Sequence, residues 1–147
     1  MKVTTQDCAH EVLEVVMLIL RIIRTVVRSR RAPDLSVQQF RSLFFLNLQP
    51  NATLSDIAEN IGLTLPSMSK MIDNLVSREL VTRHICPTDR RRVRLMLTAS
   101  GKALIDQALL AVQSALADRL TNLPAAERTA IARAMQTLRP IVTLEGR

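Results

Sequence analysis

Aromatic side chains are almost missing from this sequence, which contains three Phe, no Tyr and no Trp, an aromatic content of 2%. Proteins that recognise single-stranded RNA or DNA usually stack unpaired bases on aromatic rings. Because the chain lacks the residues for that kind of recognition, duplex DNA is the nucleic acid that the composition favours.

Cysteine and histidine are also scarce, and their positions fit no common metal or disulfide pattern. The two cysteines, Cys8 and Cys86, form neither a disulfide framework nor a metal-ligand spacing, which is typical of a reducing cytoplasm. His10 and His84 are far apart in the sequence, so no cluster of His, Cys and carboxylates has the spacing of a metal site. The chain has no Gly-rich phosphate loop and no nucleophile elbow. We therefore expect no metal, no cofactor and no enzymatic activity.

Apolar runs stay short of the length that a membrane helix needs. The run from Val15 to Leu20 is interrupted by Arg21 and Arg24 before it reaches the thickness of a bilayer, and no signal peptide is apparent. We expect a cytoplasmic protein without a membrane partner.

Positive charge, in contrast, is plentiful. Lys and Arg number 20 and Asp and Glu 13 among 147 residues, which gives a formal net charge of +7 and favours a polyanionic partner, nucleic acid first. Residues 83–94 contain five arginines and a single acidic residue, Asp89. A second arginine group lies at residues 21–31, and either a solvated helix end or a contribution to a ligand pocket or to the field facing DNA explains it.

Hydrophobic periodicity predicts a mainly α-helical chain, and its first helix is unusually apolar. Val12–Val27 is apolar around most of its circumference, so it must be buried on more than one side. A chain of this length cannot easily do that alone, so we expect this helix to be shared between two subunits. Arg28–Arg31 forms its solvated end, and Ala32-Pro33-Asp34 stops it.

Two further helices are marked by capping boxes, in which a hydroxyl and a longer polar side chain three residues later satisfy free backbone N–H groups. Ser36 and Gln39 open one helix, and Thr53 and Asp56 open a shorter one that Gly62 ends. The predicted inner faces are Phe40, Leu43, Phe44 and Leu48 in the first and Ile57, Ala58 and Ile61 in the second.

A fourth helix, Leu65–Arg78, is expected after a cap at Thr64, and it has two contrasting faces. Its predicted buried stripe is Met68, Met71, Ile72, Leu75 and Val76, whereas Pro66, Lys70, Asn74 and Ser77 face outward, with Ser67 and Ser69 on the flanks. Two strands, 81–85 and 93–97, follow and are joined by the arginine-rich loop Cys86–Arg92. A helix that fits a DNA groove, followed by a cationic hairpin that reaches the next groove, predicts a winged helix-turn-helix.

The C-terminal third is predicted to be helical as well. Thr98 caps a long helix that runs to about Leu120, and Pro124 starts a final helix that ends before Pro140.

Several blocks of the sequence, in order and at matching spacing, resemble the MarR family of bacterial transcription regulators. They are Leu35-Ser36-x-x-Gln39-Phe40-x-x-Leu43, Leu54-x-x-Ile57-Ala58-x-x-Ile61-Gly62-Leu63, Ser67-Met68-Ser69-Lys70-Met71-Ile72-Asp73-Asn74-Leu75, Asp89-Arg90-Arg91 and Leu97-Thr98-x-x-Gly101. One departure is Glu79, where many family members have Gly, and a side chain there is strained if φ is positive.

The resemblance implies a homodimer and a DNA-binding surface. It implies a single domain over residues 1–147, with a winged helix-turn-helix lobe at 36–100 and helical dimerisation regions at 1–35 and 101–147. The recognition helix would enter the major groove of a palindromic half-site and the wing arginine the adjacent minor groove, with Asp89 holding the arginine in place. The implied DNA-binding residues are Pro66, Ser67, Ser69, Lys70, Asn74, Asp89, Arg90 and Arg91.

Side-chain chemistry adds detail to these roles. Asn74 has the groups to read adenine through two hydrogen bonds, and Lys70 can read guanine or bind phosphate. Arg91 in a narrow minor groove would respond to A/T-rich shape.

The sequence thus predicts a homodimeric repressor that binds palindromic duplex DNA and is released by a small-molecule effector, such as a phenolic or aromatic anion. Two alternatives stay open: a redox-sensing repressor that acts through Cys8, and a dimeric protein-interaction module that has lost DNA binding.

Overall fold

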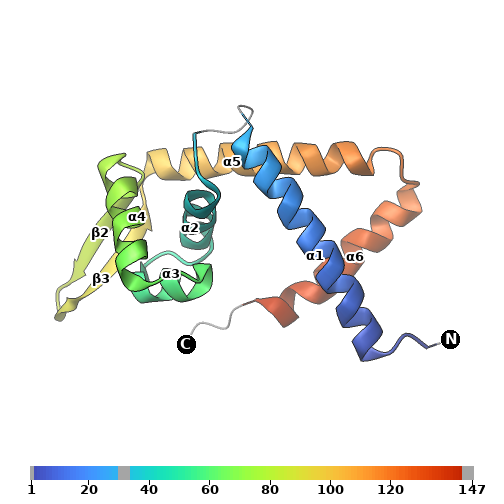
Figure 1. Ribbon diagram of the computed structural model, residues 1–147, viewed down its shortest axis with the longest axis horizontal. Coiled ribbons are helices and arrows are strands. Elements are labelled where there is room, and N and C mark those ends of the chain that lie inside the picture. Colours follow the sequence, from blue (N-terminus) through green and yellow to red (C-terminus); the bar gives the residue numbers. More distant parts are fainter. Residues whose placement is uncertain (1, 30–33, 144–147) are drawn as a thin grey trace. The chain divides into compact units, whose positions relative to one another are not determined.

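The computed structural model describes residues 2–29 and 34–143. The chain divides into two compact units, Met1–Gln113 and Ser114–Arg147. Its elements are mainly helical, as predicted, and Figure 1 labels all of them except β1. They are α1 (Thr5–Arg28), α2 (Val37–Leu48), β1 (Ala52–Thr53), α3 (Leu54–Ile61), α4 (Leu65–Ser77), β2 (Val81–Cys86), β3 (Asp89–Leu97), α5 (Ala99–Leu120) and α6 (Ala125–Val142).

The helix α2 begins at the predicted capping box but buries a different face. The Ser36 hydroxyl accepts a hydrogen bond from the Gln39 backbone, and the Gln39 side chain accepts one from the Ser36 backbone. Phe40 and Leu43 are buried as expected, and so are Phe45 and Leu46. Because α2 contacts α1, α3 and β3, more than one of its sides is covered.

The predicted burial is therefore wrong for two residues of the expected inner face of α2. Leu48 is 63% exposed and Phe44 is 37% exposed. Leu48 is the last residue of the helix, and Phe44 lines a cavity instead of entering the core.

The helices α3 and α4 form the predicted helix-turn-helix. Gly62 ends α3 in the left-handed conformation with φ +79°, which lets the chain turn sharply into the next helix. The Thr64 side chain caps α4 by accepting a hydrogen bond from the Ser67 backbone. Met68, Ile72 and Leu75 are fully buried, which confirms the centre of the predicted stripe, and Met71 and Val76 at its edge are half-buried.

The sheet has three antiparallel strands in the order β1-β3-β2, in which β2 and β3 form the expected two-stranded wing and β1 was missing from the prediction. The missing strand β1 has only two residues, and Ala52 pairs with Leu95. A strand this short is recognised by its pairing and not by any pattern of its own. The loop expected at residues 86–92 was also too long, because Cys86 pairs with Asp89 and only Pro87 and Thr88 lie between the strands.

A close approach of backbone to backbone joins α5 to the sheet. A Cβ atom added at Gly101 would lie 2.0 Å from the carbonyl oxygen of Leu80, so only glycine fits there. Thr98 caps this helix as predicted, since its hydroxyl accepts a hydrogen bond from the Gly101 backbone.

The remaining helices, α1 and α6, differ from the predictions mainly at their ends. α1 starts at Thr5, ahead of the apolar stretch, because Thr4 and Asp7 form a further capping box. The predicted stop at Ala32-Pro33-Asp34 lies mostly outside the described residues. α6 continues through Pro140 to Val142, so its predicted end was wrong. A proline removes one backbone donor from a helix, and at this position, two residues before the end, the loss is confined to the last turn.

Among the described residues, no helix is both long and apolar enough to cross a bilayer.

Candidate functional site

The outward face of α4 carries a group of polar side chains. Burial of Met68, Ile72 and Leu75 turns the opposite side of the helix toward solvent. The predicted site residues Pro66, Ser67, Lys70 and Asn74 are exposed, and Ser69 is half-buried.

The hydrogen bonds at the start of α4 leave donors free. The Thr64 hydroxyl donates to the Ser67 hydroxyl over 3.0 Å, so Ser67 keeps its own proton for another acceptor. Lys70 makes no ion pair with any residue that the structure describes, so its ammonium group is available to an anion.

Asn74 is the residue of this face that another helix holds in place. Its side-chain oxygen accepts a hydrogen bond from the side-chain nitrogen of Gln39 on α2, over 2.9 Å. The sequence identified Gln39 only as a capping residue. A contact between residues 35 positions apart depends on how α2 packs against α4, and no local signal predicts it.

The arginines of the hairpin fall into two groups, and three of them have partners within the fold. Arg83 pairs with Asp73 and thereby ties β2 to α4. Arg94 donates to the backbone oxygen of Asn51 over 3.0 Å. The Arg92 side chain lies 3.7 Å from a carboxylate oxygen of Asp89. The positions of these guanidinium groups are therefore set by the protein itself.

Arg90 and Arg91 form the second group, because neither side chain has a hydrogen-bond or ion-pair partner within residues 2–29 and 34–143. Both are exposed, and they lie near the end of a hairpin that projects away from α3 and α4 (Figure 1). The pairing register jumps between Ile85 and Cys86, so residues 90–92 form an irregularity in β3. Such a bulge changes the direction of side chains.

Asp89 acts on the backbone of the wing. One of its oxygens accepts a hydrogen bond from the Arg91 N–H over 3.0 Å, and the other faces Arg92. The carboxylate thus fixes the main chain of Arg91 while the guanidinium group of that residue stays free.

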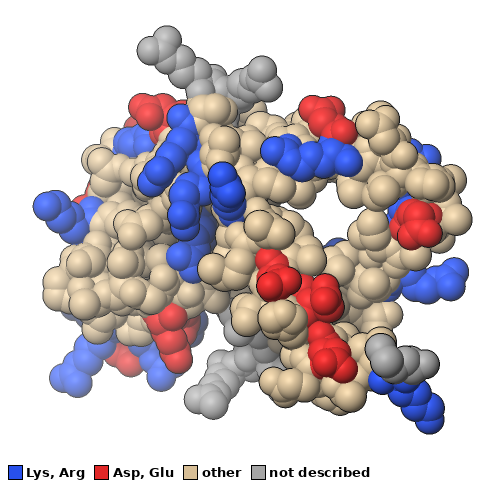
Figure 2. All heavy atoms as spheres, turned by 45° about the vertical axis from the view of Figure 1, so that its right-hand side comes forward, with Lys and Arg blue, Asp and Glu red and all other residues tan. Residues whose placement is uncertain are grey.

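Positive charge is widespread on the surface. Figure 2 shows Lys and Arg side chains scattered over the visible face, with one closely spaced group, and a separate group of Asp and Glu.

The two cysteines lie in different surroundings. Cys8 is exposed on α1. Cys86 is half-buried at the end of β2, and its sulfur lies 3.2 Å from the Thr88 hydroxyl. That hydrogen bond lowers the pKa of the Cys86 thiol, with smaller contributions from backbone N–H groups and from the charge of Arg94. The described part of the chain contains no group of three His, Cys, Asp or Glu side chains that could hold a metal.

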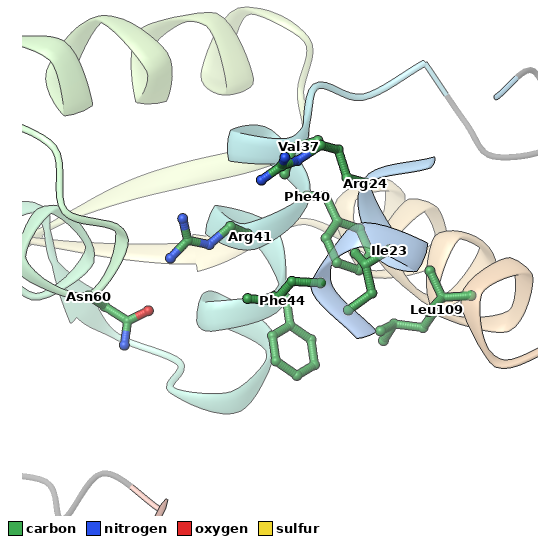
Figure 3. Close-up of a pocket in the computed structure, with 10 residues that line it drawn as sticks. Ile23, Arg24, Val37, Phe40, Arg41, Phe44, Asn60 and Leu109 are labelled. Carbon is green, nitrogen blue, oxygen red and sulfur yellow. The ribbon is translucent and has the colours of Figure 1, made fainter. Parts of the chain in front are cut away.

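A cavity of ≈ 440 Å³ lies in the same unit, between α1, α2, α3 and α5. Its walls are mostly apolar, and two arginines, Arg24 and Arg41, stand at one side of it, opposite Ile23 and Leu109 (Figure 3). The lining residues are Leu20, Ile23, Arg24, Val37, Phe40, Arg41, Phe44, Asn60, Leu109 and Val112. Neither arginine pairs with an acid of the described chain, so the cavity combines apolar walls with uncompensated positive charge. Arg41 and Asn60 were not singled out in the sequence.

Comparisons with known proteins agree on one family. Residues 35–93 match the model of the MarR family. A stretch of 75 residues is 37% identical to the Bacillus subtilis (strain 168) protein named "Uncharacterized HTH-type transcriptional regulator YhbI", and it covers 51% of this chain and 49% of that regulator. The match thus spans about half the length of this curated relative.

Solved structures share the fold over nearly the whole chain. Wild-type MarR from E. coli in its apo form gives a TM-score of 0.68 at 22% identity, with 94% of this chain and 98% of that chain covered. The transcriptional repressor CouR, solved bound to a 23-mer DNA duplex, gives a TM-score of 0.57 at 29% identity, with 92% of each chain covered. With the matched segment at residues 35–93, these findings show that the chain carries a winged helix-turn-helix domain of the MarR family.

Proposed function

We propose that this protein is a cytoplasmic, non-enzymatic transcription regulator that binds palindromic duplex DNA as a homodimer and acts as a repressor. The observation that carries the proposal is the separation of the wing arginines. Arg83, Arg92 and Arg94 have partners in the fold, whereas Arg90 and Arg91 are exposed and without partners among the described residues. Unpaired guanidinium groups at the end of a projecting hairpin suit a narrow, negatively charged minor groove.

The outward face of α4 supplies the second contact in this proposal. Ser67 has a free proton, Lys70 has a free charge and Asn74 is held at the surface, so the helix offers donors to phosphates and base edges of the major groove. A DNA-bound relative of the same fold, CouR, supports this assignment. We include Pro66, Ser69 and Asp89 in the interface because they flank or position these groups.

We propose that the apolar surfaces of the terminal helices form the dimer contact. Residues 36–100 are then the winged helix-turn-helix lobe, and residues 1–35 and 101–147 are the dimerisation regions. Within α1 only Val27 is buried, while Leu13, Met17 and Leu18 are about 60% exposed. No described residue of α6 is buried, although Ile131, Met135 and others are apolar. Apolar surfaces of this kind on a monomer indicate contact with a partner.

We also propose that the cavity between α1, α2, α3 and α5 binds the effector, an apolar or aromatic anion. The carboxylate of such a ligand would meet Arg24 and Arg41, and its ring would lie against Phe40 and Ile23. An effector releases DNA only if it binds the DNA-free conformation more tightly. Benzoate, added to the assay below, tests this part: displacement of DNA supports it, and unchanged binding at saturating benzoate contradicts an aromatic-anion site.

Fluorescence anisotropy with DNA from upstream of the protein's own gene, in competition with unrelated duplex, tests the proposal. We expect preferential binding that weakens steeply as salt rises. Arg91→Ala should weaken binding by about 1–3 kcal/mol and leave the fold intact, because a minor-groove contact is lost.

Lys2→Ala is the matched control for Arg91→Ala, since it removes the same charge from a position before α1. Equal affinities of Arg91→Ala and Lys2→Ala would show that the wing is not a DNA contact. Weak, equal binding of the wild type to both duplexes would contradict the regulator and favour the interaction module.

A further inference from the structure

Two successive hydrogen bonds determine which end of the Asn74 amide faces away from the protein. The first starts at the backbone N–H of Ser36, which can only donate and which bonds a side-chain atom of Gln39 over 2.9 Å. The Gln39 atom at that position must therefore be its oxygen. The other end of the Gln39 amide is then the NH₂ group, which lies 2.9 Å from Asn74 and requires an oxygen there.

The orientation of Asn74 follows from this order. Its oxygen is turned toward Gln39 and has one lone pair occupied, while its NH₂ group donates to no residue that the structure describes. The packing of α2 on α4 holds this arrangement, because the Ser42 hydroxyl also lies 3.3 Å from the Met71 sulfur. A two-pronged contact with adenine needs the Asn74 oxygen to accept from the base as well, and Gln39 competes for that oxygen.

We propose that Gln39 is a positioning residue that makes Asn74 a hydrogen-bond donor to DNA. The inference rests on the proposed DNA-binding function. Asn74 then reads an acceptor: O6 or N7 of guanine, O4 of thymine, or a phosphate oxygen, which share the same chemistry. Gln39 selects what Asn74 can recognise without touching DNA itself.

The variant Gln39→Glu reverses the orientation and keeps the fold. Glutamate is a standard capping-box residue, so one of its oxygens still accepts from the Ser36 N–H. Its other oxygen can only accept, so Asn74 must turn its NH₂ group inward and present its oxygen to DNA. An acceptor at this place favours the donor-bearing bases, adenine (N6) and cytosine (N4).

The experiment selects binding sites from a randomised duplex library with five full-length proteins. These are the wild type, Gln39→Glu, Gln38→Glu, Asn74→Ala and the double variant Gln39→Glu/Asn74→Ala. Gln38 is the exposed neighbour on α2, so its variant adds the same negative charge without a bond to Asn74. Anisotropy then gives the affinity of each protein for all four bases at every position of the selected site.

Two outcomes support the proposal and identify the acceptor. The first is a change of about tenfold in base preference, from guanine or thymine to adenine or cytosine, at one position per half-site with Gln39→Glu only. It would place Asn74 on a base edge. The second is a loss of affinity for all sequences that is larger with Gln39→Glu than with Gln38→Glu. This loss should disappear when Gln39→Glu/Asn74→Ala is compared with Asn74→Ala. It would place Asn74 on a phosphate.

Three outcomes overturn it. If Gln39→Glu and Gln38→Glu behave alike, Gln39 does not determine what Asn74 reads, and the DNA-binding proposal is untouched. A wild-type preference for adenine or cytosine that depends on Asn74 would show that the oxygen faces DNA. Failure of the wild type to enrich any sequence would remove the DNA-binding function, and this inference with it.

Discussion

A single hydroxyl group, that of Thr88, changes the chemistry of the Cys86 thiol. Its hydrogen bond lowers the pKa of Cys86, so more of the thiol is deprotonated near neutral pH. Thr88→Val removes the bond and should raise this pKa toward its ordinary value. We expect slower alkylation by iodoacetamide at pH 7 and a rate profile displaced to higher pH, measured in a Cys8→Ser background so that only Cys86 reacts.

Thr82→Val is the control for this measurement, because it removes a hydroxyl from the same hairpin that bonds His84 and not Cys86. Identical rate profiles for the two valine variants would show that Thr88 does not stabilise the thiolate.

At the same scale, the sequence predicted which side chains are exposed better than it predicted their partners. Lys70, Asn74, Arg90 and Arg91 are exposed as their spacing on helix and hairpin indicates. The bond from Gln39 to Asn74 was not predictable, because it depends on tertiary contacts between elements distant in the sequence.

At the scale of elements, the turn between α4 and β2 explains why many family members have glycine at the position that Glu79 occupies here. The Leu80 N–H donates to the Leu75 oxygen and the Glu79 N–H to the Val76 oxygen, both over 2.9 Å. This is the Schellman arrangement, whose C′ residue is usually glycine because its φ is positive. Here Glu79 occupies that position with φ 58°, as the sequence comparison with the family led us to suspect.

Replacing this residue should relieve strain. A left-handed conformation is unfavourable by about 1–2 kcal/mol for most residues, and glycine loses part of that gain through its freer unfolded chain. We expect Glu79→Gly to raise the free energy of unfolding by about 0.5–1 kcal/mol, measured by urea denaturation at fixed protein concentration.

Asn51→Gly is the matched control, since Asn51 has φ 66° but asparagine tolerates this conformation. Its gain should be smaller than that of Glu79→Gly. An unchanged or lower urea midpoint for Glu79→Gly would mean that the turn is not strained.

The starts of α2, α3 and α4 were predictable from sequence and strand β1 was not, for one physical reason. The caps at Ser36, Thr53 and Thr64 act within three residues, so the local sequence contains all of their chemistry. β1 exists only because Ala52 and Thr53 meet β3 more than forty positions later. Pro140 did not end α6, which continues for two residues beyond it. The backbone donor that proline lacks therefore affects only the last turn of the helix.

At the scale of the whole molecule, the chain alone leaves too much apolar surface exposed on α1. Leu13, Met17 and Leu18 are about 60% exposed on a helix in which only Val27 is buried. Burial of a leucine side chain contributes about 1.5–3 kcal/mol, so contact with a second copy would stabilise the pair considerably. The proposed binding to a palindrome would depend on that contact, because it would hold two wings and two α4 helices at a fixed spacing.

Leu18→Arg tests this dependence directly. A charge at the centre of an apolar contact loses the burial of the leucine and must itself be desolvated. The dissociation constant of the dimer, measured by sedimentation velocity, should therefore rise about 100-fold or more. Because Leu18 is exposed within one chain, the folded lobe should keep its circular dichroism spectrum.

Thr25→Arg adds the same charge at an exposed polar position of α1 and should leave the dimer unchanged. DNA affinity should fall with Leu18→Arg in parallel with dissociation, whereas a stable dimer with wild-type affinity would place the subunit contact elsewhere on the chain.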